Sequence, residues 1–561
     1  IDDVLKNDKK SAERIKIIIE ATKYAHSKYN MKVYVWCHEF SGISKIQPII
    51  YTTPNAKVWK GRKEAYKKAL KEIIPDVDGI ILMFGSAPVT PWSTISTAPQ
   101  AYRIQKIVEY IGGYVTKDLN KELFIRTFVH NPLEVPWHSM GLKSVKDVEF
   151  TGMHKGPVQD WEPYNPHHPC IGNIGNHPCV EELDVAGEYY GLAILPFCAP
   201  GYYRYRLNHL WKNNGEGAVM RVERGTNSAF NTPNEINVYA VSQFINDRNK
   251  PIEEIWDEFI GYYYKQPKVS ENAKALKEIL KNTFPIRRKS HYVRGIWAFA
   301  KSSDFPKSTK LSDGQFFSRG MMPQWDSAWL DEWSALAAFI SKQTILHIWQ
   351  EGTEAVGLAN ESLEKFKKLD ISEKKDETHK WLLHQKYTTE AWLDIDLITW
   401  SLKYRKTHPF EKKTKNWITW AYNDLIRIHD RMVEDGLSDV KVQSPASLKK
   451  FMDTVKENVG SGKGSKPQTF LFSPVKTVDV DSNSVTIEFS TNKTAKVSID
   501  YGLELPDYTN TKDIGKVEVN TLQTVTIPGL EPNSRYVVRL RGTYKNKEYL
   551  GGDFWIFTPV K

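Results

Sequence analysis

Apolar and polar positions along the first 242 residues switch repeatedly between the helix period and the strand pattern. A helical stripe opens the series at Ile15, Ile18, Ile19, Thr22 and Ala25, and a nearly continuous apolar run follows at residues 31–40. We read that run as a buried strand. The order recurs, with helices expected at residues 61–74 and 100–115 and further strands at residues 78–84, 122–129, 148–153, 180–187 and 216–223.

Continuous apolar strands that alternate with helices indicate a parallel sheet covered on both faces. Polar residues follow the carboxyl ends of these strands, where a (β/α)8 barrel of the TIM type builds its active site. They are His38, Glu39, Ser86, Arg126, His130, His154, Lys155, Glu188, Glu223 and Arg224. Six strands are visible where a closed barrel has eight. We therefore predict an α/β fold with such a barrel over residues 1–242. Its first two strands are absent from this chain, supplied by another chain or unrecognised in the pattern, and we favour the first alternative.

The pattern changes twice after the barrel. Residues 243–459 have helical periodicity throughout, which predicts an all-α domain. Residues 460–468 read GSGKGSKPQ, the composition of a flexible linker. Residues 469–561 form short alternating runs separated by turn residues, which predicts a β-sandwich. Its segment IPGLEPNSRYVVRL resembles the fibronectin type III signature, with Tyr536 at the tyrosine-corner position, and that resemblance implies a spacer or adhesion module.

Composition narrows the classes of partner. The net charge is +10, but lysines are mixed with acids along the helices, which favours solvated helix faces over a nucleic-acid track. No apolar run approaches the roughly 18 residues of a membrane span. The 18 Trp, 27 Tyr and 23 Phe exceed what a core of this size needs, and carbohydrate sites use such rings as platforms. Trp92 and Trp161 are our candidate platforms, with core packing as the alternative.

One segment, GMHKGPVQDWEPYNPHHPC at residues 152–170, gathers more functional groups than a connecting loop needs. It ends at Cys170, and a second His-Pro-Cys follows at Cys179. These two cysteines could close a small disulfide loop in an exported protein, contribute to a zinc site with the adjacent histidines, or stay free thiols. Because no tight Cys-x₂-Cys spacing is present, we predict no metal.

Several strand-end and helix motifs, in order, resemble the microbial α-glucuronidases of glycoside hydrolase family 67. They are IRTFV, HKGPVQDWEP, AGEYYG, NEINVYAVSQF and PIEEIWDEF, spread over roughly residues 15–265. The resemblance implies inverting hydrolysis of the bond to 4-O-methylglucuronic acid, without a cofactor. It also implies an all-α domain after the barrel, through which two chains pair as a homodimer. The fibronectin-like tail is an addition to the pattern.

The same resemblance assigns roles. Glu188, in AGEYYG, falls on a catalytic glutamate. Strict spacing after Gly-Pro puts Gln159 on the family's second carboxylate, and a shift of one residue puts Asp160 there, which we take as the residue that activates water with Glu188. Arg126 falls on an arginine that binds the uronate carboxylate, and His154 on a lysine with the same duty. Lys155, Trp161, Glu162, His130 and Trp92 complete the predicted substrate-binding set.

Each assignment has an alternative. Arg126 could instead be an internal partner for carboxylates. His154 and His130 could simply bond to their neighbours, Glu162 could fix its loop, and Asp160 could cap backbone amides.

The sequence departs from the family where a lysine and the general acid stand, because Met83 and Ala87 occupy those positions. Neither can donate a proton. We predict Glu39 as the substitute acid, since the flanking Trp36 and Phe40 would raise its pKa by desolvation. The inverting geometry then requires roughly 6.5–9.5 Å between acid and base.

These observations predict a glycoside hydrolase that acts on an acidic, uronic-acid-bearing glycan outside the cell or at its surface. No signal peptide is visible, so one would precede Ile1. Two alternatives stay open. The loss of the family acid and the added tail favour a non-catalytic glycan-binding protein, and Met83 in place of lysine favours a hydrolase of a neutral sugar.

Overall fold

The chain folds into two compact units. A computed structural model describes residues 2–6, 8–38, 57–83, 99–129, 131–158, 162–189, 191–224, 227–299, 303–311 and 322–561. The first unit comprises Ile1–Trp161, Asn165–Leu183 and Arg206–Val219. The second comprises Glu162–Tyr164, Asp184–Tyr205 and Met220–Lys561.

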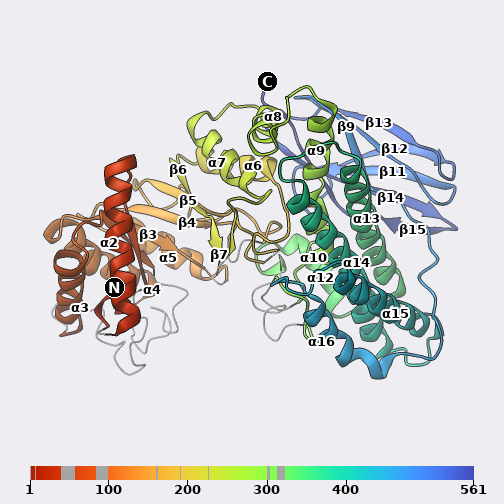
Figure 1. Ribbon diagram of the computed structural model, residues 1–561, viewed down its shortest axis with the longest axis horizontal. Helices are drawn as coiled ribbons and strands as arrows, with labels where there is room; N and C mark the ends of the chain where they lie inside the picture. The colour runs from red at the N-terminus through yellow and green to blue at the C-terminus, as the bar shows by residue number, and fades with distance from the viewer. Residues whose placement is uncertain are drawn as a thin grey trace. The chain divides into compact units, whose positions relative to one another are not determined.

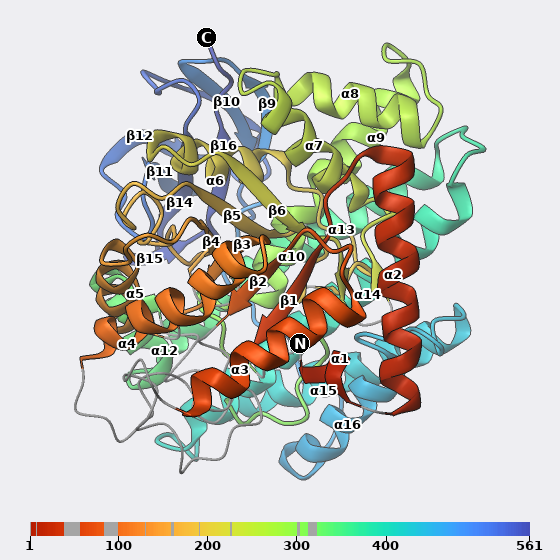
Figure 2. The same ribbon diagram turned by 90° about the vertical axis from the view of Figure 1, so that its left-hand side faces the viewer.

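Six strands form one sheet in which neighbours follow chain order, β1-β2-β3-β4-β5-β6 (Figures 1 and 2). The pairing is parallel from β1 to β5. The strands are β1 (Tyr34–His38), β2 (Gly79–Met83), β3 (Glu122–Thr127), β4 (Thr151–Gly156), β5 (Cys179–Asp184) and β6 (Gly217–Arg221). Each of the six predicted strands is confirmed. Within the described residues they make a curled half-barrel, so a closed eight-stranded barrel is not confirmed.

Helices of the first unit cover the outer face of the sheet, as Figure 2 shows for α3, α4 and α5. They are α1 (Asp2–Leu5), α2 (Lys9–Tyr29), α3 (Lys57–Lys67), α4 (Gln100–Ile107) and α5 (Glu134–Lys143), and α6 (Pro200–Lys212) runs across the boundary of the two units. Cys37 of β1 contacts this layer, with its Sγ 2.9 Å from the Tyr66 hydroxyl of α3. Since strand side chains alternate between faces, Trp36 and His38 lie on the inner face.

The second unit contains the helical region expected after the sheet. Its α-helices are α7 (Glu235–Asn246), α8 (Ile252–Tyr263), α9 (Glu271–Lys281), α10 (Thr283–His291), α12 (Leu330–Ala337), α13 (Lys342–Lys367), α14 (Lys375–Arg405), α15 (Lys412–Glu434) and α16 (Pro445–Val455). Trp392 and Trp400 of α14 are fully buried, which accounts for part of the high tryptophan content by core packing. Among the described residues, no helix is both long and apolar enough to cross a bilayer.

The C-terminal part of the second unit consists of two antiparallel sheets over a common core. One has the order β13-β10-β9, and the other the order β12-β11-β14-β15 with β16 paired to β14. The strands are β9 (Lys476–Val480), β10 (Ser484–Phe489), β11 (Ala495–Gly502), β12 (Asn510–Val517), β13 (Gln523–Pro528), β14 (Arg535–Tyr544), β15 (Lys547–Leu550) and β16 (Phe554–Phe557). The Tyr536 hydroxyl accepts a hydrogen bond from the Glu531 N–H at 3.0 Å, the backbone contact that a tyrosine corner makes.

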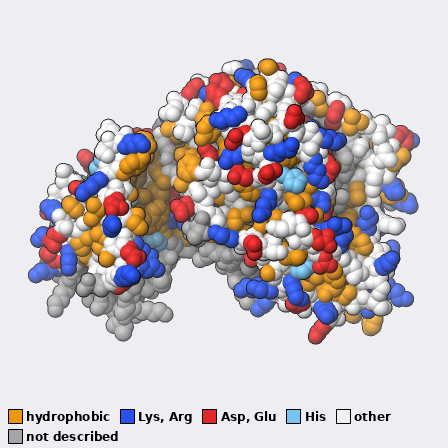
Figure 3. Space-filling view, in the orientation of Figure 1, with side chains coloured by type: hydrophobic (Ala, Val, Ile, Leu, Met, Phe, Trp, Pro, Cys, Tyr) orange, Lys and Arg blue, Asp and Glu red, His pale blue; other side chains and the backbone are white. Residues whose placement is uncertain are grey.

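The glycine-rich segment at residues 460–468 is bonded along α15. Asn423 donates to the carbonyl oxygens of Gly462 at 3.1 Å and Lys463 at 3.3 Å, and Ser465 N donates to Asn416 O at 3.2 Å. On the surface, cations and acids are interspersed (Figure 3), in line with the mixed helix faces expected from the sequence.

Candidate functional site

The inner face of the sheet in the first unit carries a buried ion pair between Arg126 of β3 and Glu182 of β5. Arg126 is 3% exposed and Glu182 2%. The guanidinium donates Nε–H to Glu182 Oε2, and Nη2–H to Oε1 at 3.1 Å. Its Nη1 lies 2.9 Å from the Met83 sulfur. All three guanidinium nitrogens are therefore engaged within the protein.

Aromatic rings surround this pair. The Arg126 guanidinium carbon lies 4.9 Å from the centre of the Trp36 ring and 5.4 Å from that of Phe128. The Lys155 ammonium lies 4.0 Å from the Phe128 ring centre, a cation–π distance. Trp36 is 38% exposed and donates its Nε1–H to His38 Nε2 at 3.0 Å, while burial and then the Arg126 charge lower the pKa of His38.

This geometry favours the internal-partner interpretation of Arg126. A sugar carboxylate could reach the guanidinium only by displacing Glu182, which already makes a two-pronged contact with it. The sequence reasoning missed Glu182. A usable signal was present, because Glu182 and Asp184 are two residues apart in the strand predicted at residues 180–187 and so share one face of β5.

His154 lies in a different environment, on the outer face of β4. Its Nδ1 is 2.8 Å from the Thr127 hydroxyl, and that hydroxyl is 3.3 Å from His168 Nε2. Burial, reinforced by His138, lowers the pKa of His154 to about 3, so the imidazole is neutral. A neutral, fully buried ring does not attract a carboxylate. The geometry therefore favours bonding to neighbours over sugar binding.

Glu181, beside His154 in the sheet register, is the least satisfied carboxyl on β5. It is fully buried, and neither oxygen has a hydrogen-bond partner among the described residues. Burial raises its pKa from the ordinary 4.5 to about 7, and Arg206 opposes the shift only in part. The folded state thus keeps a proton on Glu181 that the unfolded chain releases above pH 4.5.

We expect Glu181→Gln to stabilise the protein in a pH-dependent way. Because the folded-state pKa is raised, ionisation of Glu181 costs stability as pH rises from 4.5 to about 7. The variant should match wild type at pH 4 and exceed its free energy of unfolding by about 3 kcal/mol at pH 8. Urea unfolding at both pH values measures this difference. An equal effect at pH 4 and pH 8 would contradict it, and exposed Glu216→Gln is the control.

The second unit presents Glu188 on a turn directly after β5. Asp184 shapes the turn by accepting the N–H groups of Ala186 at 3.2 Å, Gly187 at 3.1 Å and Glu188 at 2.5 Å. Gly187 has φ +70°, and a Cβ there would lie 2.6 Å from the Phe197 ring. Asp184 therefore holds the main chain that orients Glu188.

The Glu188 carboxylate is 7% exposed and lies beside a cation. Arg221 Nη1 is 3.9 Å from Glu188 Oε2, and the Arg221 side chain is 30% exposed. Ser303 donates to the Glu188 carbonyl oxygen at 2.7 Å and accepts the Gly191 N–H at 3.0 Å, which fixes the far side of the turn. Burial raises the pKa of Asp184 to about 6, with the Glu188 N–H opposing and the Glu188 charge adding to the shift.

Glu162 is buried in the same unit, near a tyrosine that the sequence reasoning did not single out. Burial first, and then the charge of Glu162, raise the pKa of Tyr292 well above its ordinary value. Asp184 also acts on Tyr292. Tyr292 also packs against Tyr164, two residues after Glu162, with the ring centres 5.3 Å apart. Because Glu162 is almost fully buried, the loop-fixing interpretation is favoured for it over direct substrate contact.

Several predicted site residues fall outside the described part of the chain. They are Glu39, Trp92, His130, Asp160 and Trp161, together with the departure at Ala87. Their roles stay predictions.

The cysteines that left three alternatives open are buried free thiols. Burial raises the pKa of Cys170 to about 12, so it is held as a thiol rather than a thiolate. The described residues contain no group of three or more His, Cys, Asp or Glu side chains arranged to hold a metal ion.

Known proteins resemble this chain in fold rather than in sequence. No family model matches it, and no curated protein does. A solved structure described as a GH138 enzyme targeting pectin rhamnogalacturonan II superposes with a TM-score of 0.53 at 10% identity. The match covers 81% of this chain and 72% of that one. The chain has a glycoside-hydrolase-like fold. The comparisons support neither family 67 in particular nor the fibronectin type III assignment of the C-terminal sandwich.

Proposed function

We propose that the protein is a glycoside hydrolase acting on an acidic plant polysaccharide or its oligosaccharides. The observation that carries the proposal is the turn built by Asp184, which presents Glu188 beside Arg221 after β5. Barrel hydrolases carry their catalytic acids at this end of their strands. The fold neighbour, an enzyme that targets a pectic polysaccharide, supports the same class of substrate.

In the proposed reaction Glu188 is the general base. A water oxygen, oriented by Glu188 and Asp160, bonds to the anomeric carbon, and its proton passes to Glu188. The glycosidic C–O bond breaks as Glu39 donates a proton to the leaving oxygen. The outcome is inversion, for which an acid–base separation of roughly 6.5–9.5 Å is expected. No cofactor takes part, because proton transfer between carboxyl groups is sufficient.

Recognition of the uronate carboxylate is assigned to Arg221 in preference to Arg126. Arg126 is buried and makes two hydrogen bonds to Glu182, whereas the Arg221 side chain is 30% exposed and its ion pair with Glu188 is longer, at 3.9 Å. The Lys155 ammonium contacts the Phe128 ring on the inner face of the sheet, so this cation, like Arg126, already has a partner within the protein. The motif resemblance favours glucuronic acid on xylan, and the fold neighbour favours a pectic sugar.

The test is a reducing-sugar assay on uronic-acid oligosaccharides from xylan and from pectin, with neutral xylo- and gluco-oligosaccharides alongside. We expect release of a uronic acid from one acidic set and none from the neutral set, and ¹H NMR of the product should reveal the inverted anomer. Turnover of neutral substrates alone would overturn the acidic assignment in favour of the neutral-sugar hydrolase.

A second candidate is a glycan-binding protein without catalysis, acting, like the enzyme, outside the cell or at its surface. It is favoured by Ala87, which stands at the position of the family's general acid, and by the added C-terminal sandwich. Calorimetry with the same oligosaccharides separates the candidates, because binding without turnover would select this one. The homodimer through the helical region stays a prediction.

A further inference from the structure

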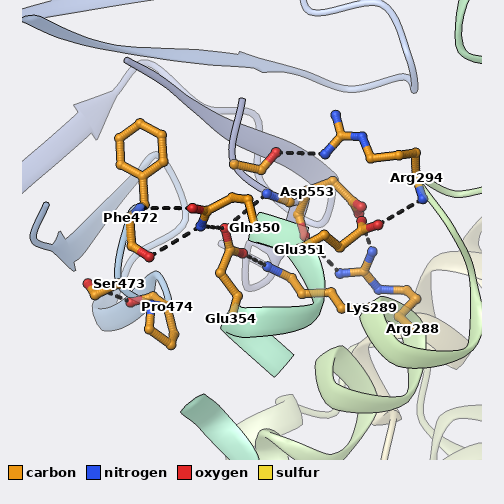
Figure 4. Close-up of polar contacts among 12 residues, drawn as sticks. Arg288, Lys289, Arg294, Gln350, Glu351, Glu354, Phe472, Ser473, Pro474 and Asp553 are labelled. Carbon is orange, nitrogen blue, oxygen red and sulfur yellow. Dashed lines mark hydrogen bonds and ion pairs between the residues drawn. The ribbon is translucent and has the colours of Figure 1, made fainter. Parts of the chain in front are cut away.

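The C-terminal sandwich is joined to the helical region of the second unit by a buried polar network (Figure 4). Three cations from α10 and the residues after it enter the network. Arg288 pairs with Asp553, and Lys289 pairs with Glu354 of α13. Arg294 Nη1 donates to the Gly551 carbonyl oxygen at 3.0 Å. The Arg288 and Lys289 side chains are each 1% exposed, so these contacts are shielded from water.

Helix α13 fixes two separate segments of the sandwich. Gln350 accepts the Phe472 N–H at 3.0 Å and donates to the Phe472 carbonyl oxygen at 3.2 Å. Glu354 accepts the Gly552 N–H at 3.0 Å. The entry of the sandwich and the turn before β16 are thus both hydrogen-bonded to one helix. A spacer module that only displays a neighbouring domain would not require such contacts.

One end of this network reaches the loop that carries Glu162. The Tyr164 hydroxyl donates to Asp553 Oδ1 at 2.9 Å and accepts from Arg288 Nη1 at 2.7 Å. The Tyr164 ring centre lies 5.4 Å from that of Trp555 and 5.3 Å from that of Tyr292. Tyr164 is therefore fixed at its hydroxyl and on its ring, only two residues after Glu162.

The packing around Tyr164 leaves little room for another position. Gly295 has φ +79°, and a Cβ there would lie 2.8 Å from Trp329 and 3.1 Å from the Tyr164 ring. Tyr292 packs against the same ring, and Trp297, two residues after Gly295, lies with its ring centre 5.2 Å from that of Tyr189, the neighbour of Glu188. A displacement of Tyr164 would therefore be transmitted to Tyr292 and, through residues 295–297, to Tyr189 beside Glu188.

We infer that Asp553 of the C-terminal sandwich is a positioning residue for the hydrolytic site, acting through Tyr164 on Glu162 and Tyr292. This inference rests on the proposed function of Glu188. The sandwich is then part of the catalytic unit rather than an appendage. Asp553 touches no reacting atom, and its effect is to hold the loop that borders the site.

The chain offers a matched control in the same sandwich. Asp500 of β11 is also buried, pairs with Arg541 at 2.9 Å and Arg539 at 3.5 Å, and accepts the Thr511 hydroxyl at 2.9 Å. Asp553→Asn and Asp500→Asn therefore remove the same charge from similar surroundings. Of these two aspartates, Asp553 is the one bonded to Tyr164.

The experiment compares full-length Asp553→Asn, Asp500→Asn and Tyr164→Phe. We expect both asparagine variants to lower Tm to a similar extent. Asp553→Asn should lower kcat by about 100-fold with KM changed less than about threefold, as a displacement near 1 Å can produce. Tyr164→Phe keeps the ring, and its kcat should fall about tenfold. Asp500→Asn should keep the wild-type kcat. Equal kcat values for Asp553→Asn and Asp500→Asn would overturn the inference.

A second readout does not depend on turnover. Hydrogen–deuterium exchange of the peptide containing residues 162–166 should be faster in Asp553→Asn than in wild type, and unchanged in Asp500→Asn. Faster exchange in a protein that cleaves no glycan would overturn the proposed function and leave the loop-holding role of Asp553 supported. Unchanged exchange in Asp553→Asn would overturn that role even if the wild type is an active hydrolase.

Discussion

Replacing Glu188 by glutamine is expected to lower kcat on the acidic oligosaccharide by about 10³-fold, within the range that general acid–base groups supply. The amide has nearly the same shape but cannot accept a proton from water. The turn should survive, because Asp184 bonds to the main-chain N–H of Glu188 and not to its side chain. Initial rates at saturating substrate measure the change.

Two observations separate loss of the base from general damage. Glu216→Gln makes the same substitution at an exposed position just before β6, and should change kcat less than about twofold, as surface replacements do. Azide needs no deprotonation, so it should restore turnover of Glu188→Gln as a glycosyl azide of inverted configuration. Retention of more than a tenth of wild-type kcat without azide would show that Glu188 is not the base.

Removing one member of the Arg126–Glu182 pair is expected to cost about 3–5 kcal/mol of unfolding free energy. Glu182→Leu leaves a buried guanidinium without its carboxylate, and Arg126→Met leaves a buried carboxylate without its cation. The double variant leaves neither charge, and should recover to within about 2 kcal/mol of wild type. Urea unfolding of the four proteins completes a double-mutant cycle.

The control cycle uses Lys16 and Glu20 of α2, an exposed pair 3.8 Å apart at i,i+4. The coupling free energy between Lys16 and Glu20 should be about 0.3–0.5 kcal/mol, as for other surface pairs. The double variant Arg126→Met/Glu182→Leu, once stable, also bears on substrate recognition. If Arg221 and not Arg126 binds the uronate, its KM should stay close to that of wild type. A double variant no more stable than the singles would mean that Arg126 and Glu182 do not act as a pair.

The order of elements could be predicted from local sequence alone. Strands of a covered parallel sheet carry apolar runs, so β1, β2 and β3 stand out from the amphipathic helices between them. In β4 and β5 polar and charged residues interrupt the run. The strands of the C-terminal sandwich stand out for a related reason. Antiparallel strands with one solvent-exposed face alternate between apolar and polar residues. The hydrogen bond of Tyr536 could also be predicted from local sequence, because its partner Glu531 is only five residues away.

The bounds of β4 show where local patterns fail. The sequence predicts a strand at residues 148–153, whereas the structure has Thr151–Gly156. The polar residues His154 and Lys155 resemble a strand end. They continue the strand because Thr127 of β3 pairs with His154 and Glu182 of β5 pairs with Lys155. Pairing with neighbours, not side-chain polarity, sets that boundary.

Side-chain partners were decided only by the tertiary structure. The position of Arg126 at a strand end is visible in the sequence, but its commitment to Glu182 depends on the register of three strands. The bond from Tyr164 to Asp553 joins residues 389 positions apart, for which one sequence holds no local signal. The sequence by itself therefore determined the elements, their order and the strand end that carries Glu188. Only the fold decided which charges neutralise one another, because ion pairing depends on the distances between elements that are far apart in the sequence.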